Sequence, residues 1–224
     1  MSKRFPINRI ASTFLYKGVE YPMTITFSDY VEEDITWLSI FFNARAYYKA
    51  GLRCLEPKKL GNGGIESLTL PSIVTYLFSI ELFLKSLYLI EQPKLKRGHK
   101  VVDLYEKLST DVQIDIKERF EIIYKQLHKE LLFAKDVIEK STLQDDNGDS
   151  LKQRHLDALN FVLNISFSGF LEAINDFFVT VRYDFEKSNN ILYMDSLIWI
   201  LATVLYEILQ EKFENHIRAE NPLA

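Results

Sequence analysis

The chain has 224 residues, of which 47% are hydrophobic and 26% are charged, a composition typical of a globular protein. Lys and Arg total 27 against 31 Asp and Glu, so the net charge of -4 gives no overall attraction to nucleic acid or to an anionic membrane. Any site for a polyanion must therefore be local. A chain of this size buries about 70% of its unfolded surface, so we expect one compact domain with a small appendage.

The cysteine content and the N-terminus both predict a cytoplasmic protein. Cys54 is the only cysteine and has no partner for an intramolecular disulfide, which is typical of a reducing compartment. The basic N-terminus lacks a continuous apolar segment of signal-peptide length, and charges or prolines interrupt the later apolar segments. We therefore expect no membrane span.

Residues 13–27 predict a β-hairpin. Bulky side chains alternate on both sides of a Lys-Gly turn, and Pro22 restricts the second strand to the edge of a sheet. We therefore assign residues 1–28 to an N-terminal appendage that consists of this hairpin.

The pattern changes at Asp29, and helical periodicity predicts an all-α domain of about six helices over residues 29–224. Acidic residues 32–34 would occupy the first turn of the first helix, and Pro71 the first turn of the second. The predicted helices span about residues 29–56, 71–91, 101–108, 111–138, 151–183 and 193–217.

A charged pair, Glu81 and Lys85, lies inside the otherwise apolar second helix. Residues four apart share one helix face, and the apolar neighbours of this pair predict that the face is at least partly buried. Buried charges require partners, so we expect both side chains to be paired.

Four segments together resemble the HEPN family, the helical "higher eukaryotes and prokaryotes nucleotide-binding" domains. They are FFNARAYYKAGLRC in the first helix, then SIELFLKSLYL, GHKVVDLYEKL and FFVTVRYDFE. The likeness covers about residues 29–217. It implies a HEPN-like helical bundle, a homodimer whose two copies face each other, and a setting in bacterial defence or a toxin-antitoxin system. Aromatic-rich segments such as FSGFLEAINDFFVTVRY also favour a homodimer, because they supply both core and interface surface.

Ribonuclease members of the family have an Arg followed, after four to six residues, by a His. The resemblance places that Arg at Arg182, but Lys187, Ser188 and Asn189 occupy the His positions. None of these titrates near neutral pH as His does, and loss of a general base costs about 10²–10⁴ in rate. The family's ribonuclease mechanism is therefore damaged here.

Arg182 and Glu186 are spaced like Glu81 and Lys85, so the two helices could interlock their charge pairs. Two readings stay open: a salt-bridge cluster that fixes helix register, or a polar site at a dimer cleft that extends to Asn189. Tyr183, beside the pair, would hydrogen-bond in the core or stack on a base.

His99 begins the third helix and lies in the densest basic patch of the chain. It would cap the helix and dock the loop, or contact a ligand phosphate. The patch would serve as a solvated loop that complements the preceding helix dipole, or would bind RNA or a nucleotide. Its members are Lys94, Lys96, Arg97 and Lys100.

Several enzyme classes are disfavoured by missing motifs. None of the four His residues has a Glu three positions before it, and there is no His-Glu-x-x-His, so we expect no metal site. The acidic loop at residues 145–149 resembles a calcium loop, but Ser150 and Leu156 stand where that loop needs its Gly and its Glu. Residues 61–64 lack the Gly-Lys-Ser/Thr of a phosphate-binding loop. We expect no cofactor.

Two functions remain from the sequence. The first is a non-catalytic or weakly catalytic HEPN-like module that binds a partner protein, a nucleotide or RNA. The alternative is a metal-independent endoribonuclease that uses Arg182 with a relocated base, for which His99 is the candidate.

Overall fold

A computed structural model of the chain describes residues 9–16, 19–26, 35–56, 58–59, 65–66, 68–92, 94, 98–141, 151–180 and 191–220. The chain divides into two compact units, Met1–Thr36 and Trp37–Ala224. The first unit holds strands β1 (Arg9–Tyr16) and β2 (Val19–Thr26), which pair antiparallel with Arg9 opposite Thr26 and Tyr16 opposite Val19.

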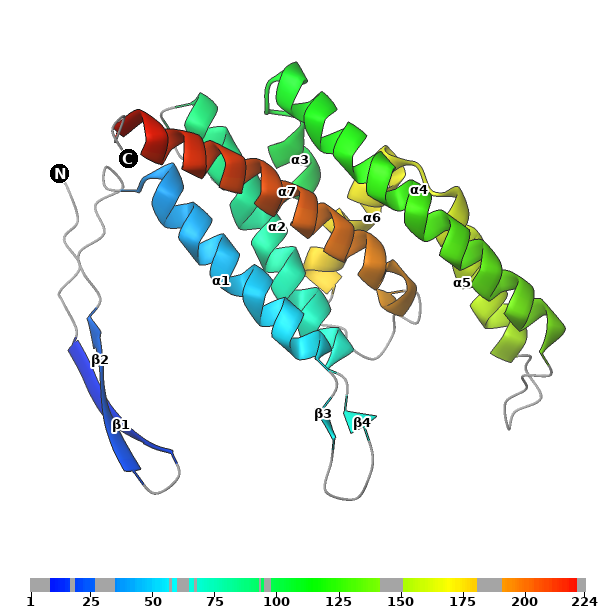
Figure 1. Cartoon of the computed structure of the whole chain (residues 1–224), viewed down its shortest axis with the longest axis horizontal. Helices are drawn as coiled ribbons and strands as arrows, with labels where there is room; N and C mark the ends of the chain where they lie inside the picture. The colour runs from blue at the N-terminus through cyan, green and yellow to red at the C-terminus, as the bar shows by residue number, and fades with distance from the viewer. Residues whose placement is uncertain are drawn as a thin grey trace. The chain divides into compact units, whose positions relative to one another are not determined.

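The second unit is predominantly helical (Figure 1). A two-residue strand pair, β3 (Lys58–Lys59) and β4 (Ile65–Glu66), separates its first two helices. Within the described residues the helices are α1 (Trp37–Leu55), α2 (Thr69–Glu91), α3 (Val101–Tyr105), α4 (Thr110–Lys140), α5 (Leu151–Asn164), α6 (Phe167–Thr180) and α7 (Ile191–Glu220).

Small side chains at seven-residue spacing let α1 and α2 pack closely. Ser72, Ser79 and Ser86 on α2 are buried, as are Ala44 and Gly51 on α1. Ser86 Oγ donates to the carbonyl of Trp37 at one end of this antiparallel pair, at 2.8 Å, and Gly51 lies against the Tyr76 ring at the other. Seven residues are about two helical turns, so the small residues line a single contact face.

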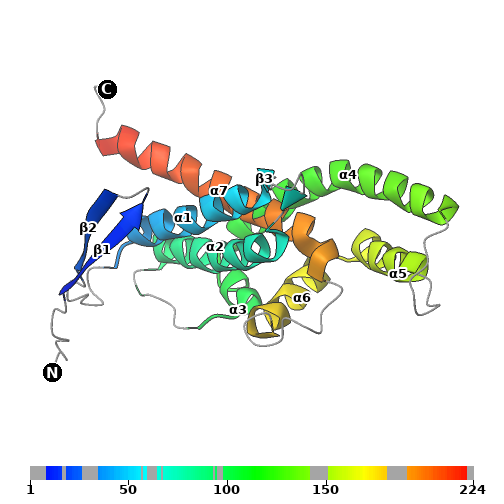
Figure 2. The ribbon, with the colours of Figure 1, turned by 90° about the horizontal axis from the view of Figure 1, so that it is seen from below.

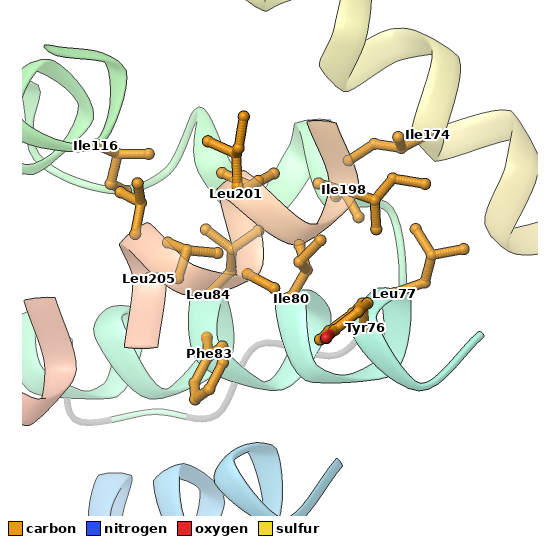
Figure 3. Close-up of a cluster of buried hydrophobic side chains, with 14 of the residues drawn as sticks. Tyr76, Leu77, Ile80, Phe83, Leu84, Ile116, Ile174, Ile198, Leu201 and Leu205 are labelled. Carbon is orange, nitrogen blue, oxygen red and sulfur yellow. The ribbon is translucent and has the colours of Figure 1, made fainter. Parts of the chain in front are cut away.

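The core is built around α2, which contacts α1, α3, α6 and α7. Figure 3 shows its apolar side chains meeting those of α7, with Ile116 of α4 and Ile174 of α6 at the margins. Among the described residues, α2 is the one helix long and apolar enough to cross a membrane, yet 56% of its most apolar window is buried in the helical unit. Here it serves as the core helix.

The prediction of one fifth helix over residues 151–183 was wrong, because Ile165 and Ser166 separate α5 from α6. Ser166 is the N-cap of α6: its Oγ accepts a hydrogen bond from the backbone N–H of Gly169 at 3.1 Å. The break turns α6 back against α2 and α3. The described part of the chain therefore has seven helices instead of six.

The first helix begins later than predicted. Ile35 and Thr36 are not helical, and α1 starts at Trp37, which has edge contact with the ring of His216. Thr36, a residue type favoured at N-caps, directly precedes the helix. The acidic residues predicted for its first turn lie outside the described residues.

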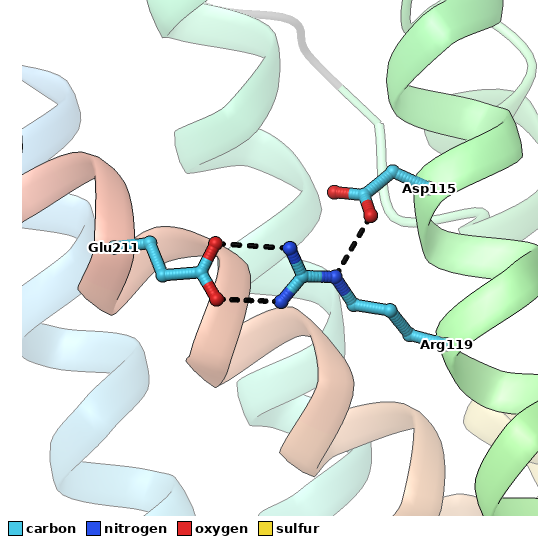
Figure 4. Close-up of polar contacts among 3 residues, drawn as sticks. All are labelled: Asp115, Arg119 and Glu211. Carbon is cyan, nitrogen blue, oxygen red and sulfur yellow. Dashed lines mark hydrogen bonds and ion pairs between the residues drawn. The ribbon is translucent and has the colours of Figure 1, made fainter.

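An arginine joins α4 to α7, while α5 lies alongside the distal part of α4 (Figure 2). Figure 4 shows the Arg119 guanidinium bound through both terminal nitrogens to Glu211, at 2.6 and 2.9 Å, and through Nε to Asp115 at 2.8 Å. These contacts raise the pKa of Arg119, and Arg119 lowers the pKa of Glu211. The network fixes the position of α4 along α7.

We expect Gly51→Ala to destabilise the helical unit. A Cβ at this position would lie 2.7 Å from Tyr76 Cε1 and 2.9 Å from Thr75 Oγ1. Overpacking costs about 1–3 kcal/mol, which exceeds the gain of about 0.5–1 kcal/mol from replacing Gly in a helix. Thermal unfolding followed by circular dichroism should show a lower Tm. Asn43→Ala on the exposed face of α1 is the control and should not lower it; an unchanged Tm for Gly51→Ala would refute the close packing.

The Arg119–Glu211 contact predicts a pH-dependent contribution to stability. Because the pKa of Glu211 is lower in the folded state, the contribution is complete above its unfolded value of 4.5 and disappears as pH falls through the lowered pKa. Both side chains are partly exposed, so Glu211→Gln should cost at most about 1 kcal/mol at pH 7. Melting curves of parent and variant should differ at pH 7 and converge as the pH falls from 4.5 through the lowered pKa of Glu211. Glu118→Gln, on the exposed face of α4, should show no such convergence.

Candidate functional site

A buried carboxylate near the middle of α2 holds two nitrogen groups. The side chain of Glu81 is only 6% exposed, and its Oε1 lies 2.6 Å from Lys85 Nζ and 2.8 Å from His99 Nδ1. Lys85 reaches it along one helix face, while His99 comes from the turn before α3. Burial of an unpaired carboxylate is costly, and these two groups compensate it.

A glycine allows the turn that brings in His99. Gly98 has φ of 128°, a conformation that L side chains rarely adopt, although a Cβ there would meet no atom within 4 Å. Glycine is therefore needed at position 98 because of the backbone conformation, and not because a side chain would clash. Val101 and Leu104, both buried, then fix α3 against the core.

The His99 ring is anchored on one side and open on the other. Its side chain is 70% exposed, and an ionised carboxylate can only accept hydrogen bonds, so Nδ1 donates to Glu81. In the neutral ring, Nε2 then carries the lone pair on the opposite side. A carboxylate that orients a histidine in this way is the arrangement that supports a general base or a ligand contact.

The structure brings together three of the predicted site residues, Glu81, Lys85 and His99. Lys94 and Lys100 of the basic patch are exposed. The other predicted residues lie outside the described part of the chain, so the interlocking of two charge pairs stays a prediction; these are Lys96, Arg97, Arg182, Tyr183, Glu186 and Asn189.

A cleft of about 980 Å³ opens between α3, α4 and α6, with Leu197 of α7 also in its lining. Aromatic rings form much of its wall: the Phe167 ring centroid lies 5.0 Å from that of Phe120 and 5.5 Å from that of Tyr105. Tyr124 continues the wall along α4, and its hydroxyl donates to the carbonyl of Val162 at 2.7 Å. Contacts among α3, α4 and α6, together with the hydrogen bond to Val162 of α5, therefore hold the wall in place.

Charged residues border the aromatic wall. Lys117 and Glu121 pair at 3.8 Å, Glu106 and Glu172 come from the turn after α3 and from α6, and the middle of α4 supplies Lys125, His128 and Lys129. Within the described part of the chain, neither Lys125 nor Lys129 forms an ion pair.

The cleft was not predicted from the sequence. Phe120 lies in the helix predicted over residues 111–138, and it is buried. The available signal was the four-residue spacing of Phe120, Tyr124 and His128, which places two aromatic rings and an imidazole along one face of the helix. The wall that faces α4 could not be predicted, because α6 forms it only after the break at Ile165 and Ser166.

Metal binding has no support in the described residues, where no three His, Cys, Asp or Glu side chains gather closely enough to hold an ion. No protein-family model, curated protein or solved structure matches the chain. We therefore infer its function from the residues themselves.

We expect Lys85→Ala to lower the Tm clearly. The Lys85 side chain is 12% exposed, and its loss leaves the buried Glu81 carboxylate with only the exposed His99, a change that costs about 3–5 kcal/mol for a fully buried pair. The matched control is Lys140→Ala, which breaks an exposed pair of the same spacing with Asp136 and should cost no more than about 1 kcal/mol. Equal melting temperatures for the two variants would contradict the burial of this cluster.

Proposed function

We propose that the helical part of the chain is a HEPN-like module that works by binding RNA or a nucleotide, with little or no catalysis of its own. One contact supports this proposal: Glu81 Oε1 lies 2.8 Å from His99 Nδ1. Glu81 belongs to SIELFLKSLYL and His99 to GHKVVDLYEKL, so two of the segments that carry the resemblance meet at one polar point.

The binding surface is centred on His99. The anchored ring presents Nε2 to solvent, and the exposed cations Lys94 and Lys100 flank it in sequence. Lysines contact phosphate as point charges, and an oriented imidazole adds a directed hydrogen bond. The module would act in the cytoplasm, as the lone Cys54 suggests, and as a homodimer, as the resemblance implies. A partner protein is the remaining class of ligand for this surface.

A metal-independent endoribonuclease is the second candidate, and the anchoring of His99 favours it. A neutral Nε2 would take the proton of a ribose 2′-hydroxyl, while Arg182 would stabilise the charge that develops on the phosphate. Against it stands the absence of His at the three positions where the family has one, and we therefore place binding first.

Incubation of the purified chain with mixed RNA in EDTA tests both candidates. We expect retention of RNA without cleavage, and retention should weaken in His99→Ala and in Lys94→Ala/Lys100→Ala, because each removes a phosphate contact. Lys135→Ala/Lys140→Ala removes the same charge from the far end of α4 and should leave retention unchanged. Filter binding and gel electrophoresis measure the two readouts.

Cleavage that Arg182→Ala abolishes would establish the endoribonuclease in place of the binding module. The absence of both cleavage and retention would refute RNA as the ligand and leave a nucleotide or a partner protein.

A further inference from the structure

We propose that residues 99–109 form a strap that opens and closes as one unit and thereby couples the His99 surface to the cleft between α3, α4 and α6. The strap contains α3, and two glutamates of α2 hold its ends. The coupling arises from contacts within the chain, so it does not depend on the ligand proposed above.

The two ends of the strap are held in the same way. Glu81 accepts the hydrogen bond of His99 Nδ1 at 2.8 Å, and ten residues later Glu91 accepts one from the backbone N–H of Ser109, also at 2.8 Å. The Ser109 hydroxyl donates to the other oxygen of Glu91. Both pairs are 18 residues apart, so the strap follows about 15 Å of α2 between these two end contacts.

Ser109 lies at the N-cap of α4, but its hydroxyl does not cap that helix. A serine at this position usually accepts a hydrogen bond from the first turn of its own helix. Here the hydroxyl is directed to Glu91, the last residue of α2. Ser109 therefore fixes the end of the strap to α2 instead of stabilising the start of α4.

Between its ends the strap depends on contacts with the rest of the helical unit. α3 has only five residues, too few to be stable alone. Val101, Leu104 and Leu108 are buried and pack into the core. Segments held by a few buried side chains open locally as cooperative units, at a lower free energy than global unfolding. We therefore expect release of either end to loosen the whole strap.

Opening of the strap changes both surfaces together. The His99 imidazole keeps its orientation only while the first end is closed. Tyr105, in the middle of the strap, lines the cleft, and its hydroxyl donates to the carbonyl of Gln113 at 3.0 Å. Gln113 Nε2 donates back to the carbonyl of Leu108 at 2.8 Å, which joins the first turn of α4 to the second end. A ligand that binds the closed form at one surface therefore stabilises the other surface too.

Hydrogen exchange of single amides in the full chain, followed by NMR, tests the strap. The amides of Leu104, Glu106 and Leu108 donate to carbonyls inside it. In the parent their protection factors should agree within about threefold, because one opening exposes all three. They should also lie at least about tenfold below those of the buried Leu201 and Leu205 in α7, because the strap opens without global unfolding.

Ser109→Asp places a carboxylate against Glu91 and should accelerate all three amides by the same factor, about tenfold, because repulsion replaces a charge-assisted hydrogen bond. Ser109→Asn is the matched control: both residues are favoured at N-caps, but Asn is neutral and should exchange as the parent does. Adding Glu91→Lys to Ser109→Asp creates an opposite pair and should restore slow exchange. His99→Ala, at the other end, should accelerate Leu108 as much as Leu104.

Two results would overturn the proposal. Acceleration of Leu108 alone in Ser109→Asp, or of Leu104 alone in His99→Ala, would show that the two ends move separately. Strap amides as well protected as those of Leu201 and Leu205 would show that this segment opens only when the whole helical unit unfolds.

Discussion

The burial of α2 on several faces is the constraint on which the helical unit depends. Ser79, Ile80 and Glu81 are consecutive and all buried, and successive residues are about 100° apart around a helix, so no single neighbour can cover them. An apolar helix of this kind requires partners on more than one side, and α1, α3, α6 and α7 supply them. The serines at seven-residue spacing keep one side narrow enough for α1 to approach closely. The Tyr76 side chain is 1% exposed, and this burial raises the pKa of its phenol to about 12.

A carboxylate placed in such a helix has few ways to remain charged. Glu81 is compensated once from within α2, by Lys85, and once from outside, by His99. The first contact forms with the helix itself, whereas the second requires the Gly98 turn and the docking of α3. Because the buried Glu81 carboxylate needs a second partner, the contact with His99 holds an imidazole in a fixed orientation at the surface. The Arg119 network differs in this respect: its members are partly exposed, and it fixes the register of two helices without presenting a reactive group.

Local pattern predicted those features that depend on neighbours in the chain. The apolar run of α2, the helix predicted over residues 111–138, and the paired burial of Glu81 with Lys85 follow from residues three or four positions apart. Three features were missed, because they depend on a single cap or on contacts between residues far apart in the chain. The break at Ile165 and Ser166 lies inside a continuous apolar pattern, and a serine hydroxyl caps the helix that follows it. His99 was expected to cap the third helix and dock its loop, or to contact a ligand phosphate, but α3 has no side-chain cap. Its contact with Glu81 was not predicted, because it joins residues 18 apart and depends on how α3 is docked. The cleft was unpredictable for the same reason, since its two walls meet only after α6 has turned back.

Both candidate sites converge on α3, although it has only five residues. A helix of this length is not stable alone, so tertiary contacts determine its position. Val101 and Leu104 anchor it in the core, the Glu81 contact of His99 holds its beginning, and the Tyr105 hydroxyl donates to the carbonyl of Gln113 at 3.0 Å at its end. The imidazole surface precedes this short helix, and one wall of the aromatic cleft lies on it. Its anchoring therefore sets the geometry of both sites, and the core packing of α2, which α3 contacts directly, is what keeps that anchoring in place.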